Sequence, residues 1–236
     1  MHCHILPGID DGAQSFEETA GMLEMAYAEG IRTIVATPHH HPDPKRGMPD
    51  IEEILKAYTV TKEYIMKKYP DMRLHVGMEI RYTENMTKMD SQILTMNKTR
   101  AVMLEFGSLD VKQTFRRALS RYSCQGLHVI VAHAERYDLL TRDIDFLESL
   151  VNQGVVIQVN AQSLNVGRFS GAKKLIDAWM ERNLIHVVGT DAHSTTWRAP
   201  AMREAYKKTK RRYGKRKADA LFHDNAEAIL NGRWDF

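Results

Sequence analysis

The sequence has no long hydrophobic run and no recognisable leader. No stretch of about 18 apolar residues occurs, so we expect no segment that spans a membrane. The amino-terminal residues also lack a charged head followed by an apolar segment and a small-residue cleavage site, which is the pattern of a secretory signal peptide. We therefore expect a cytoplasmic protein.

Cysteine is also scarce. Cys3 and Cys124 are too few for a disulfide framework, and they lack CxxC spacing. Neither begins a C-x5-R loop, because Ile9 and Ile130 stand six residues after them. If the protein cleaves phosphate esters, we do not expect its nucleophile to be a cysteine.

The chain has little excess charge of either sign. A formal net charge of +3 does not indicate a nucleic-acid binder. One stretch is locally basic, and we favour its interpretation as the solvated face of a late helix, with a docking patch for an acidic or phosphorylated partner as the alternative. Its residues are Lys207, Lys208, Lys210, Arg211, Arg212, Lys215, Arg216 and Lys217.

What the sequence does have is a regular alternation of apolar strands and amphipathic helices. With 236 residues, 43% of them hydrophobic, it suits one domain, which we take as residues 1–236. A first helix begins at the capping box formed by Ser15 and Glu18. Strands are expected at 31–36, 74–80, 101–106, 127–132, 155–159 and 184–188, and helices at 51–69, 110–122, 143–153, 170–182 and 200–213.

Short apolar strands separated by helices predict an α/β fold. They imply parallel strands with right-handed crossovers, and continuous apolar runs imply that both sheet faces are covered. A seventh strand should end at the amino terminus, where it is either very short or cut off. A closed or nearly closed barrel is the favoured architecture, and an open doubly wound sheet is the alternative.

Nearly every predicted strand ends in a side chain that could bind a metal. In parallel α/β folds the working residues gather at the carboxyl ends of the strands. These strand-end residues are His2, His4, Asp10 and Asp11; His39, His40 and His41; Glu79; Glu105; His133, Glu135 and Arg136; Asn160; and Asp191 and His193.

The residue types at these ends suit divalent cations. His2 and His4 are two apart, so on a strand both point to one side. Glu79 and Glu105 end apolar runs, where an unpaired carboxylate would be costly to bury. A lone strand-end histidine more often caps a carbonyl, and Glu105 could pair with an arginine such as Arg100 or Arg136. The coincidence at successive strand ends is what favours metal, with Zn, Mn or Fe suited better than Mg or Ca.

A charge count indicates the substrate class. Three divalent ions with four carboxylates (Asp11, Glu79, Glu105 and Asp191), neutral histidines and a bridging hydroxide leave a positive site that would favour a phosphate monoester dianion. Arg136 could add a bidentate clamp on the phosphoryl oxygens. The expected mechanism is in-line attack by metal-bound hydroxide, without a covalent intermediate.

The order of these motifs resembles the polymerase-and-histidinol-phosphatase (PHP) superfamily. Within it, the segments HILPGIDDGAQSFEET, RTIVATPHH, AHAERY and GTDAH look most similar to bacterial protein-tyrosine phosphatases of capsular and exopolysaccharide synthesis. The resemblance covers essentially the whole chain. It departs from the family only at the start, where the family usually has a few residues before the HxH motif.

The resemblance implies a distorted (β/α)7 TIM-like barrel with a cluster of three divalent ions, Mn favoured over Fe, Zn or Mg. It implies hydrolysis of phosphotyrosine on the tail of a bacterial tyrosine kinase, which would recruit the protein to a membrane-bound complex. Asp11 is preferred to Asp10, and Glu79 would bridge two ions. The implied ligands are His2, His4, Asp11, His39, Glu79, Glu105, His133, Asp191 and His193. Catalytic roles fall to Arg136, Asp191 and His193, and substrate contacts to Arg136, Arg46 and His40. The segment 40–47, with Lys45 and Arg46, lies beside the site and is our candidate for the loop that reads the tyrosine ring.

Three other functions stay open from the sequence. A small-molecule phosphatase, such as one for histidinol phosphate, would use the same site. Amidohydrolases also place HxH on a first barrel strand, but they typically have a lysine at a strand end, and no strand end here offers one. A non-catalytic regulator could bind the kinase tail through the basic stretch at 207–217.

Overall fold

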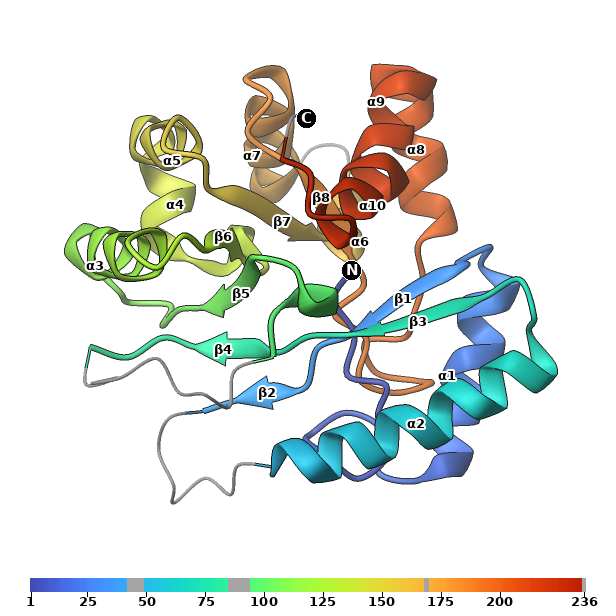
Figure 1. Ribbon diagram of the computed structural model, residues 1–236. Coiled ribbons are helices and arrows are strands. Elements are labelled where there is room, and N and C mark those ends of the chain that lie inside the picture. Colours follow the sequence, from blue (N-terminus) through green and yellow to red (C-terminus); the bar gives the residue numbers. More distant parts are fainter. Residues whose placement is uncertain (42–48, 85–93, 168–169, 235–236) are drawn as a thin grey trace.

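The computed structural model describes residues 1–41, 49–84, 94–167 and 170–234, and it has a mixed α/β architecture (Figure 1). The strands are β1 (Thr33–Ala36), β2 (His39–His40), β3 (Arg73–Val76), β4 (Glu79–Arg81), β5 (Ala101–Glu105), β6 (His128–Val131), β7 (Val156–Asn160) and β8 (Val187–Gly189). The α-helices are α1 (Phe16–Ala28), α2 (Ile51–Lys68), α3 (Lys112–Ser123), α4 (Asp138–Arg142), α5 (Ile144–Val151), α6 (Ala161–Leu164), α7 (Gly171–Glu181), α8 (Arg203–Tyr213), α9 (Lys215–Asp219) and α10 (Asn225–Leu230). Shorter helical turns are η2 (Met96–Lys98), η3 (Ala134–Arg136) and η4 (Ala220–Asp224).

All of these strands pair in parallel, as the sequence predicts. β1 pairs with β3, and a six-stranded sheet has the order β2-β4-β5-β6-β7-β8. β2 continues β1 and β4 continues β3 (Figure 1), so the strand predicted at 74–80 is interrupted at Gly77 and Met78. At this break η2 packs directly against the backbone, and a Cβ added to Gly77 would lie 2.5 Å from the Met96 sulfur.

The amino-terminal segment lies between the two ends of the sheet. Cys3 forms a parallel bridge with Ala192, just after β8. On the other side, the Thr37 N–H donates to the Cys3 carbonyl at 2.9 Å, just after β1. The parallel α/β sheet is therefore strongly curled, with residues 2–4 inserted beside both of its ends.

Both faces of the curled sheet are apolar and buried. On β5, Val102 and Leu104 belong to a large outer cluster under the helices, whereas Ala101 and Met103 belong to a smaller inner cluster. Ile229 and Leu230, at the end of α10, also belong to the inner cluster. Because side chains alternate along a strand, the next inward-facing position on β5 is Glu105.

The predicted elements are present, with several differences at their boundaries. The helix predicted at 143–153 is the shorter α5, and α4 precedes it without having been predicted. The elements after α8 were also not predicted. At the start of α1, Ser15 accepts from the Glu18 N–H as expected, but Glu18 accepts from the Gln14 N–H instead of that of Ser15. A reciprocal capping box is formed instead at α2, between Asp50 and Glu53.

The basic stretch on α8 and α9 is a solvated helix face, as favoured. Its side chains are exposed or half-buried, and several are paired with acidic neighbours, such as Arg212 with Asp177 at 2.7 Å. Among the residues that the structure describes, no helix combines the length and apolarity needed to cross a bilayer.

Candidate metal centre

His2 and His4 point to the same side of the amino-terminal segment. Both side chains are buried, and their Nε2 atoms are 3.2 Å apart. Cys3, between them, points the other way, and its thiol lies 3.8 Å from the Ala192 carbonyl. Two-residue periodicity therefore brings the two imidazoles together, as the HxH spacing predicts.

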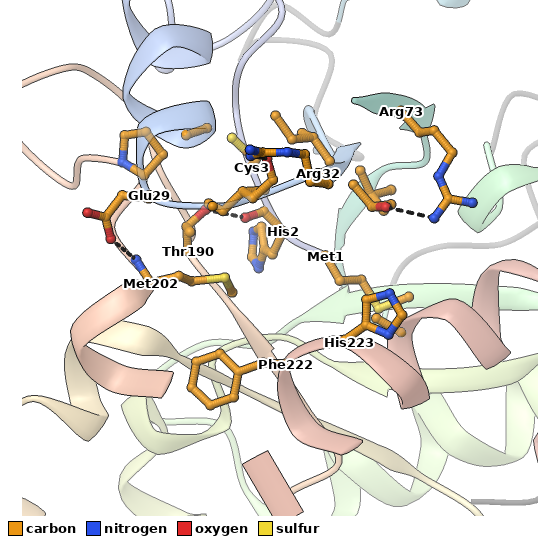
Figure 2. Close-up of a pocket in the computed structure, with 18 of the residues that line it drawn as sticks. Met1, His2, Cys3, Glu29, Arg32, Arg73, Thr190, Met202, Phe222 and His223 are labelled. Carbon is orange, nitrogen blue, oxygen red and sulfur yellow. Dashed lines mark hydrogen bonds between the residues drawn. The ribbon is translucent and has the colours of Figure 1, made fainter. Parts of the chain in front are cut away.

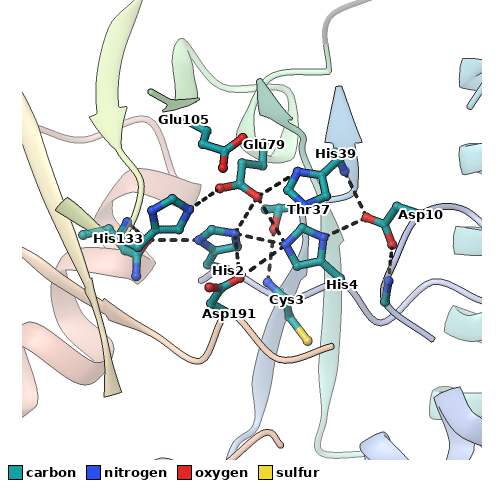
Figure 3. Close-up of polar contacts among 12 residues, drawn as sticks. His2, Cys3, His4, Asp10, Thr37, His39, Glu79, Glu105, His133 and Asp191 are labelled. Atoms are coloured by element: carbon teal, nitrogen blue, oxygen red, sulfur yellow. Dashed lines mark hydrogen bonds and ion pairs between the residues drawn. The ribbon is translucent and has the colours of Figure 1, made fainter. Parts of the chain in front are cut away.

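Glu79, the first residue of β4, lies at the centre of the imidazoles (Figure 3). Its Oε1 atom is 2.7 Å from Nε2 of His133. Its Oε2 atom is 3.1 Å from Nε2 of His2, 3.3 Å from Nε2 of His4 and 3.2 Å from Nδ1 of His39. One carboxylate thus faces histidines from three separate segments of the fold.

Asp191, just after β8, faces the imidazoles of His2 and His4 from the side opposite Glu79 (Figure 3). Its Oδ1 atom is 3.5 Å from Nε2 of both His2 and His4. Its Oδ2 atom accepts from Asn160 at 3.0 Å and pairs with Arg136 at 2.8 Å. The backbone of Asp191 is in the left-handed region, with φ at 50°, a conformation that is uncommon outside glycine.

Asp10 positions histidines instead of facing the centre of the cluster. Its Oδ2 atom lies 2.7 Å from Nδ1 of His4 and accepts from the His39 N–H at 3.0 Å. The following turn requires a glycine, because a Cβ at Gly12 would lie 2.1 Å from the His4 carbonyl oxygen. Asp10 therefore orients histidines, whereas the neighbouring Asp11 belongs to a group of potential ligand atoms.

Asp11 belongs to one of three groups of potential ligand atoms. Its Oδ1 atom is 3.4 Å from Nε2 of both His39 and His193. The three groups are His4, Asp11, His39 and His193; His2, His4, Glu79 and Asp191; and His39, Glu79 and Glu105. Every predicted ligand except His133 occurs in them, and His133 contacts Glu79 directly.

The donor set fits divalent cations. Ligand atoms that share one cation at a bond length of about 2.1 Å lie about 3.0–3.4 Å apart, and the distances around Oε2 of Glu79 are 3.1–3.3 Å. Among the described residues this buried oxygen has no hydrogen-bond partner, a costly condition for a carboxylate. Imidazole with carboxylate suits Mn, Fe or Zn.

The site is also electrostatically organised for cations. Burial would raise the pKa of Glu79, but the imidazoles of His2 and His133 hold that pKa well below its usual range. Burial would lower the pKa of His4, yet the hydrogen bond to Asp10 raises it well above its usual value. Protons and metal ions therefore compete for the same nitrogen atoms.

Two arginines reach the cluster, and the sequence singled out only one of them. Arg136 follows His133 in η3, as predicted. Arg198 was not predicted: its guanidinium lies 2.9 Å from Nε2 of His193 and 3.5 Å from Oδ2 of Asp191. It stands five residues after His193 in a loop whose course no motif reveals.

Two polar residues, Gln158 and Tyr137, support the histidines. Gln158 lies 3.0 Å from Nδ1 of His2 and accepts from the His133 N–H at 2.8 Å. The Tyr137 hydroxyl is 3.2 Å from Nδ1 of His133. Gln158 and Asn160 alternate with apolar residues on β7, and polar residues at inward positions of a buried strand were the signal that could have identified Gln158.

His40, a predicted substrate contact, does not belong to the three groups of potential ligand atoms. It is buried, at 3% exposure. It follows His39 on β2, so strand alternation sends it to the other face. Arg46 and the rest of the predicted substrate-reading loop at 42–47 lie outside the described residues. Glu105 is 3.6 Å from Arg81, an arginine that the sequence had not suggested as its partner.

A separate cavity of about 440 Å³ lies beside the amino terminus (Figure 2). It is lined by Met1, by β1, by Met202 and the first turns of α8, and by Phe222 of η4. Of the predicted ligands only His2 lines this cavity. Its surroundings are mainly apolar, so it does not offer the donor set found around Glu79.

Comparison with known proteins gives consistent matches over the full chain. The profile of the family described as "Capsular polysaccharide synthesis, CpsB/CapC" matches residues 1–231. The tyrosine-protein phosphatase CpsB of Streptococcus agalactiae is 32% identical over 243 residues, which cover 99% of this chain and 98% of that protein. The tyrosine-protein phosphatase YwqE of Bacillus subtilis is 30% identical, over 100% of this chain and 92% of that protein.

A solved structure agrees with these matches. It comes from a study of YwqE from Bacillus subtilis and CpsB from Streptococcus pneumoniae, described as metal-dependent tyrosine phosphatases. It superposes on this chain with a TM-score of 0.89 and 29% identity, covering 100% of this chain and 95% of the other.

Proposed function

Because this chain belongs to the CpsB/CapC family of capsular polysaccharide synthesis, we propose that it is a metal-dependent phosphotyrosine-protein phosphatase whose active site is the cluster around Glu79. The family predicted from the motifs is confirmed, and the relatives' names agree with the predicted class of phosphoric monoester hydrolase. The observation that carries the proposal is the central position of the Glu79 carboxylate among imidazoles from three segments.

The residues proposed to hold the ions are those brought together by the curled sheet. They are His2, His4, Asp11, His39, Glu79, Glu105, His133, Asp191 and His193. When bound, divalent cations lower the pKa of water to make a nucleophile near neutral pH and neutralise charge on a phosphate ester. Three ions, with Mn favoured, would match the three groups of donor atoms.

The protein's own contribution to substrate binding is a pair of arginines. Arg136 and Arg198 both contact Oδ2 of Asp191, and their side chains are 39% and 19% exposed. Partly exposed guanidinium groups beside a cation site are suited to the oxygens of a phosphoryl group. We therefore assign them to orienting the phosphate, with Asp191 holding them in place before substrate arrives.

The substrate is proposed to be phosphotyrosine on the tail of a bacterial tyrosine kinase that regulates polysaccharide synthesis, in the cytoplasm. The family description and the relatives' names support this assignment. We further infer that residues 1–236 act as one domain in which the amino-terminal segment supplies the seventh strand of a distorted (β/α)7 barrel. Its hydrogen bonds to Thr37 and Asp191 support that closure.

The test compares substrates on protein reloaded with Mn. The proposal expects phosphotyrosine peptides and aryl phosphates to be cleaved much faster than alkyl phosphates, while faster cleavage of histidinol phosphate would favour a small-molecule phosphatase. The Asp191→Ala and His133→Ala variants should each lose activity. Full activity in both would remove the metal site from the mechanism, whereas a wild-type protein that binds the kinase tail without hydrolysing phosphotyrosine would favour a non-catalytic regulator.

A further inference from the structure

Trp197 is an exposed aromatic side chain beside the metal centre. It lies in the loop after β8, and its exposed fraction is 65%. Among the large exposed hydrophobic side chains of the described residues it is the one aromatic. Single exposed hydrophobic residues are common and need no explanation on their own, so the contacts of Trp197 decide its significance.

Trp197 contacts two residues of the active site. Its ring centre is 6.0 Å from that of His193, with the planes at 73°. The Arg198 guanidinium carbon lies 4.6 Å from the centre of the indole ring. The indole therefore packs against the same guanidinium that contacts Asp191.

The loop that carries Trp197 is held by local hydrogen bonds. The Ser194 hydroxyl accepts from the Trp197 N–H at 2.9 Å and donates to the Trp197 carbonyl at 2.7 Å. The His193 N–H donates to the Arg198 carbonyl at 3.0 Å. These bonds hold the backbone that carries the indole beside His193 and Arg198.

We propose that Trp197 is the specificity-determining residue that packs against the aromatic ring of phosphotyrosine. The inference rests on the proposed phosphatase function. In phosphotyrosine only one oxygen separates the phosphorus from the ring, so a phosphoryl group held by Arg198 brings the ring within reach of an indole that stacks on that arginine. Alkyl phosphates have no ring to place there.

The expected effect is moderate and confined to ligands with a ring. Aromatic pairs contribute an amount that corresponds to about three- to tenfold in affinity. Aryl esters are also hydrolysed faster because of their better leaving group, so rates on substrates would mix two causes. Phosphonates, which are not hydrolysed, isolate binding.

The experiment measures dissociation constants by calorimetry on the Mn-loaded chain of 236 residues, with phenylphosphonate and methylphosphonate as ligands. Trp197→Ala should weaken phenylphosphonate binding about three- to tenfold and leave methylphosphonate within about twofold, whereas Trp197→Phe should retain wild-type affinity. The matched control is Met66→Ala on α2, since Met66 is equally exposed at 66% and should change neither constant.

The results separate this inference from the proposed function. Equal weakening of both phosphonates, or no change in phenylphosphonate binding, would overturn the role of Trp197. Phosphatase activity on a phosphotyrosine peptide is measured separately with the wild-type protein. Absence of that activity would overturn the proposed function, while the binding data would still decide whether Trp197 recognises the ring.

Discussion

The substitution Glu79→Gln tests the carboxylate at the centre of the site. It preserves the size of the side chain and removes its negative charge. In the structure this charge faces His133 at 2.7 Å and the imidazoles of His2, His4 and His39 at 3.1–3.3 Å. If those atoms hold cations, the substitution removes a ligand and its charge together.

The magnitude follows from the position of Glu79. Changing a group that only supports a metal ligand typically costs 10–100-fold in metal affinity or activity. Glu79 faces the proposed ion positions directly, so we expect Mn affinity to fall at least about a hundredfold. At a Mn concentration about a hundred times the wild-type dissociation constant, the variant should lose most of about 2.7 kcal/mol of ligand-linked stabilisation.

The assay is thermal unfolding with and without Mn, together with kcat on an aryl phosphate. Wild-type protein should melt at a higher temperature when Mn is added, and Glu79→Gln should show little shift and at least about a hundredfold lower kcat. The control is Glu84→Gln, whose exposed carboxylate pairs with Arg117 at 2.7 Å and should contribute less than about 1 kcal/mol. A Glu79→Gln protein with a wild-type Mn shift and wild-type kcat would exclude Glu79 as a metal ligand.

Three further predictions follow from the structure. Arg198→Ala should lower kcat/KM for phosphotyrosine peptides about 10- to 100-fold, since a hydrogen bond to a charged group contributes about 1.5–3 kcal/mol. Steady-state kinetics measure this ratio, and an unchanged kcat/KM would exclude Arg198 from substrate binding. Gln158→Leu should weaken Mn binding about 10- to 100-fold, measured by metal titration, because Gln158 orients His2 and the His133 backbone. Burial raises the pKa of the Cys3 thiol to about 11, so iodoacetamide at pH 8 should modify the exposed Cys124 and leave activity intact. Mass spectrometry identifies the alkylated cysteine, and loss of activity on alkylation would contradict a mechanism without cysteine.

Much of the site could be predicted because it depends on short-range periodicity. Parallel strands place their carboxyl ends at one edge, and two-residue alternation then selects which side chains face inward. On β5, Ala101 and Met103 face inward, and two-residue alternation places Glu105 on the same inner face. The parallel register of β2 and β4 places His39 beside Glu79. The sequence alone therefore located these residues, and the structure brings them together.

The rest depends on contacts between distant segments. Arg198, whose own backbone φ is 53°, reaches the site from the loop after β8. Arg81 approaches Glu105 from the neighbouring strand. At the break in the strand after Val76, Met96 from a distant segment packs against Gly77. None of these has a local sequence signature, because each is decided by the packing of segments that lie far apart in the chain.

The most direct test of a metal cluster at the strand ends is elemental analysis combined with an anomalous-scattering map of crystals grown without chelator. We expect about three divalent ions per chain, located among the donor groups around Glu79, with activity lost on chelation and restored by Mn. Folded and fully active protein that contains no divalent metal would exclude a catalytic metal cluster at the strand ends.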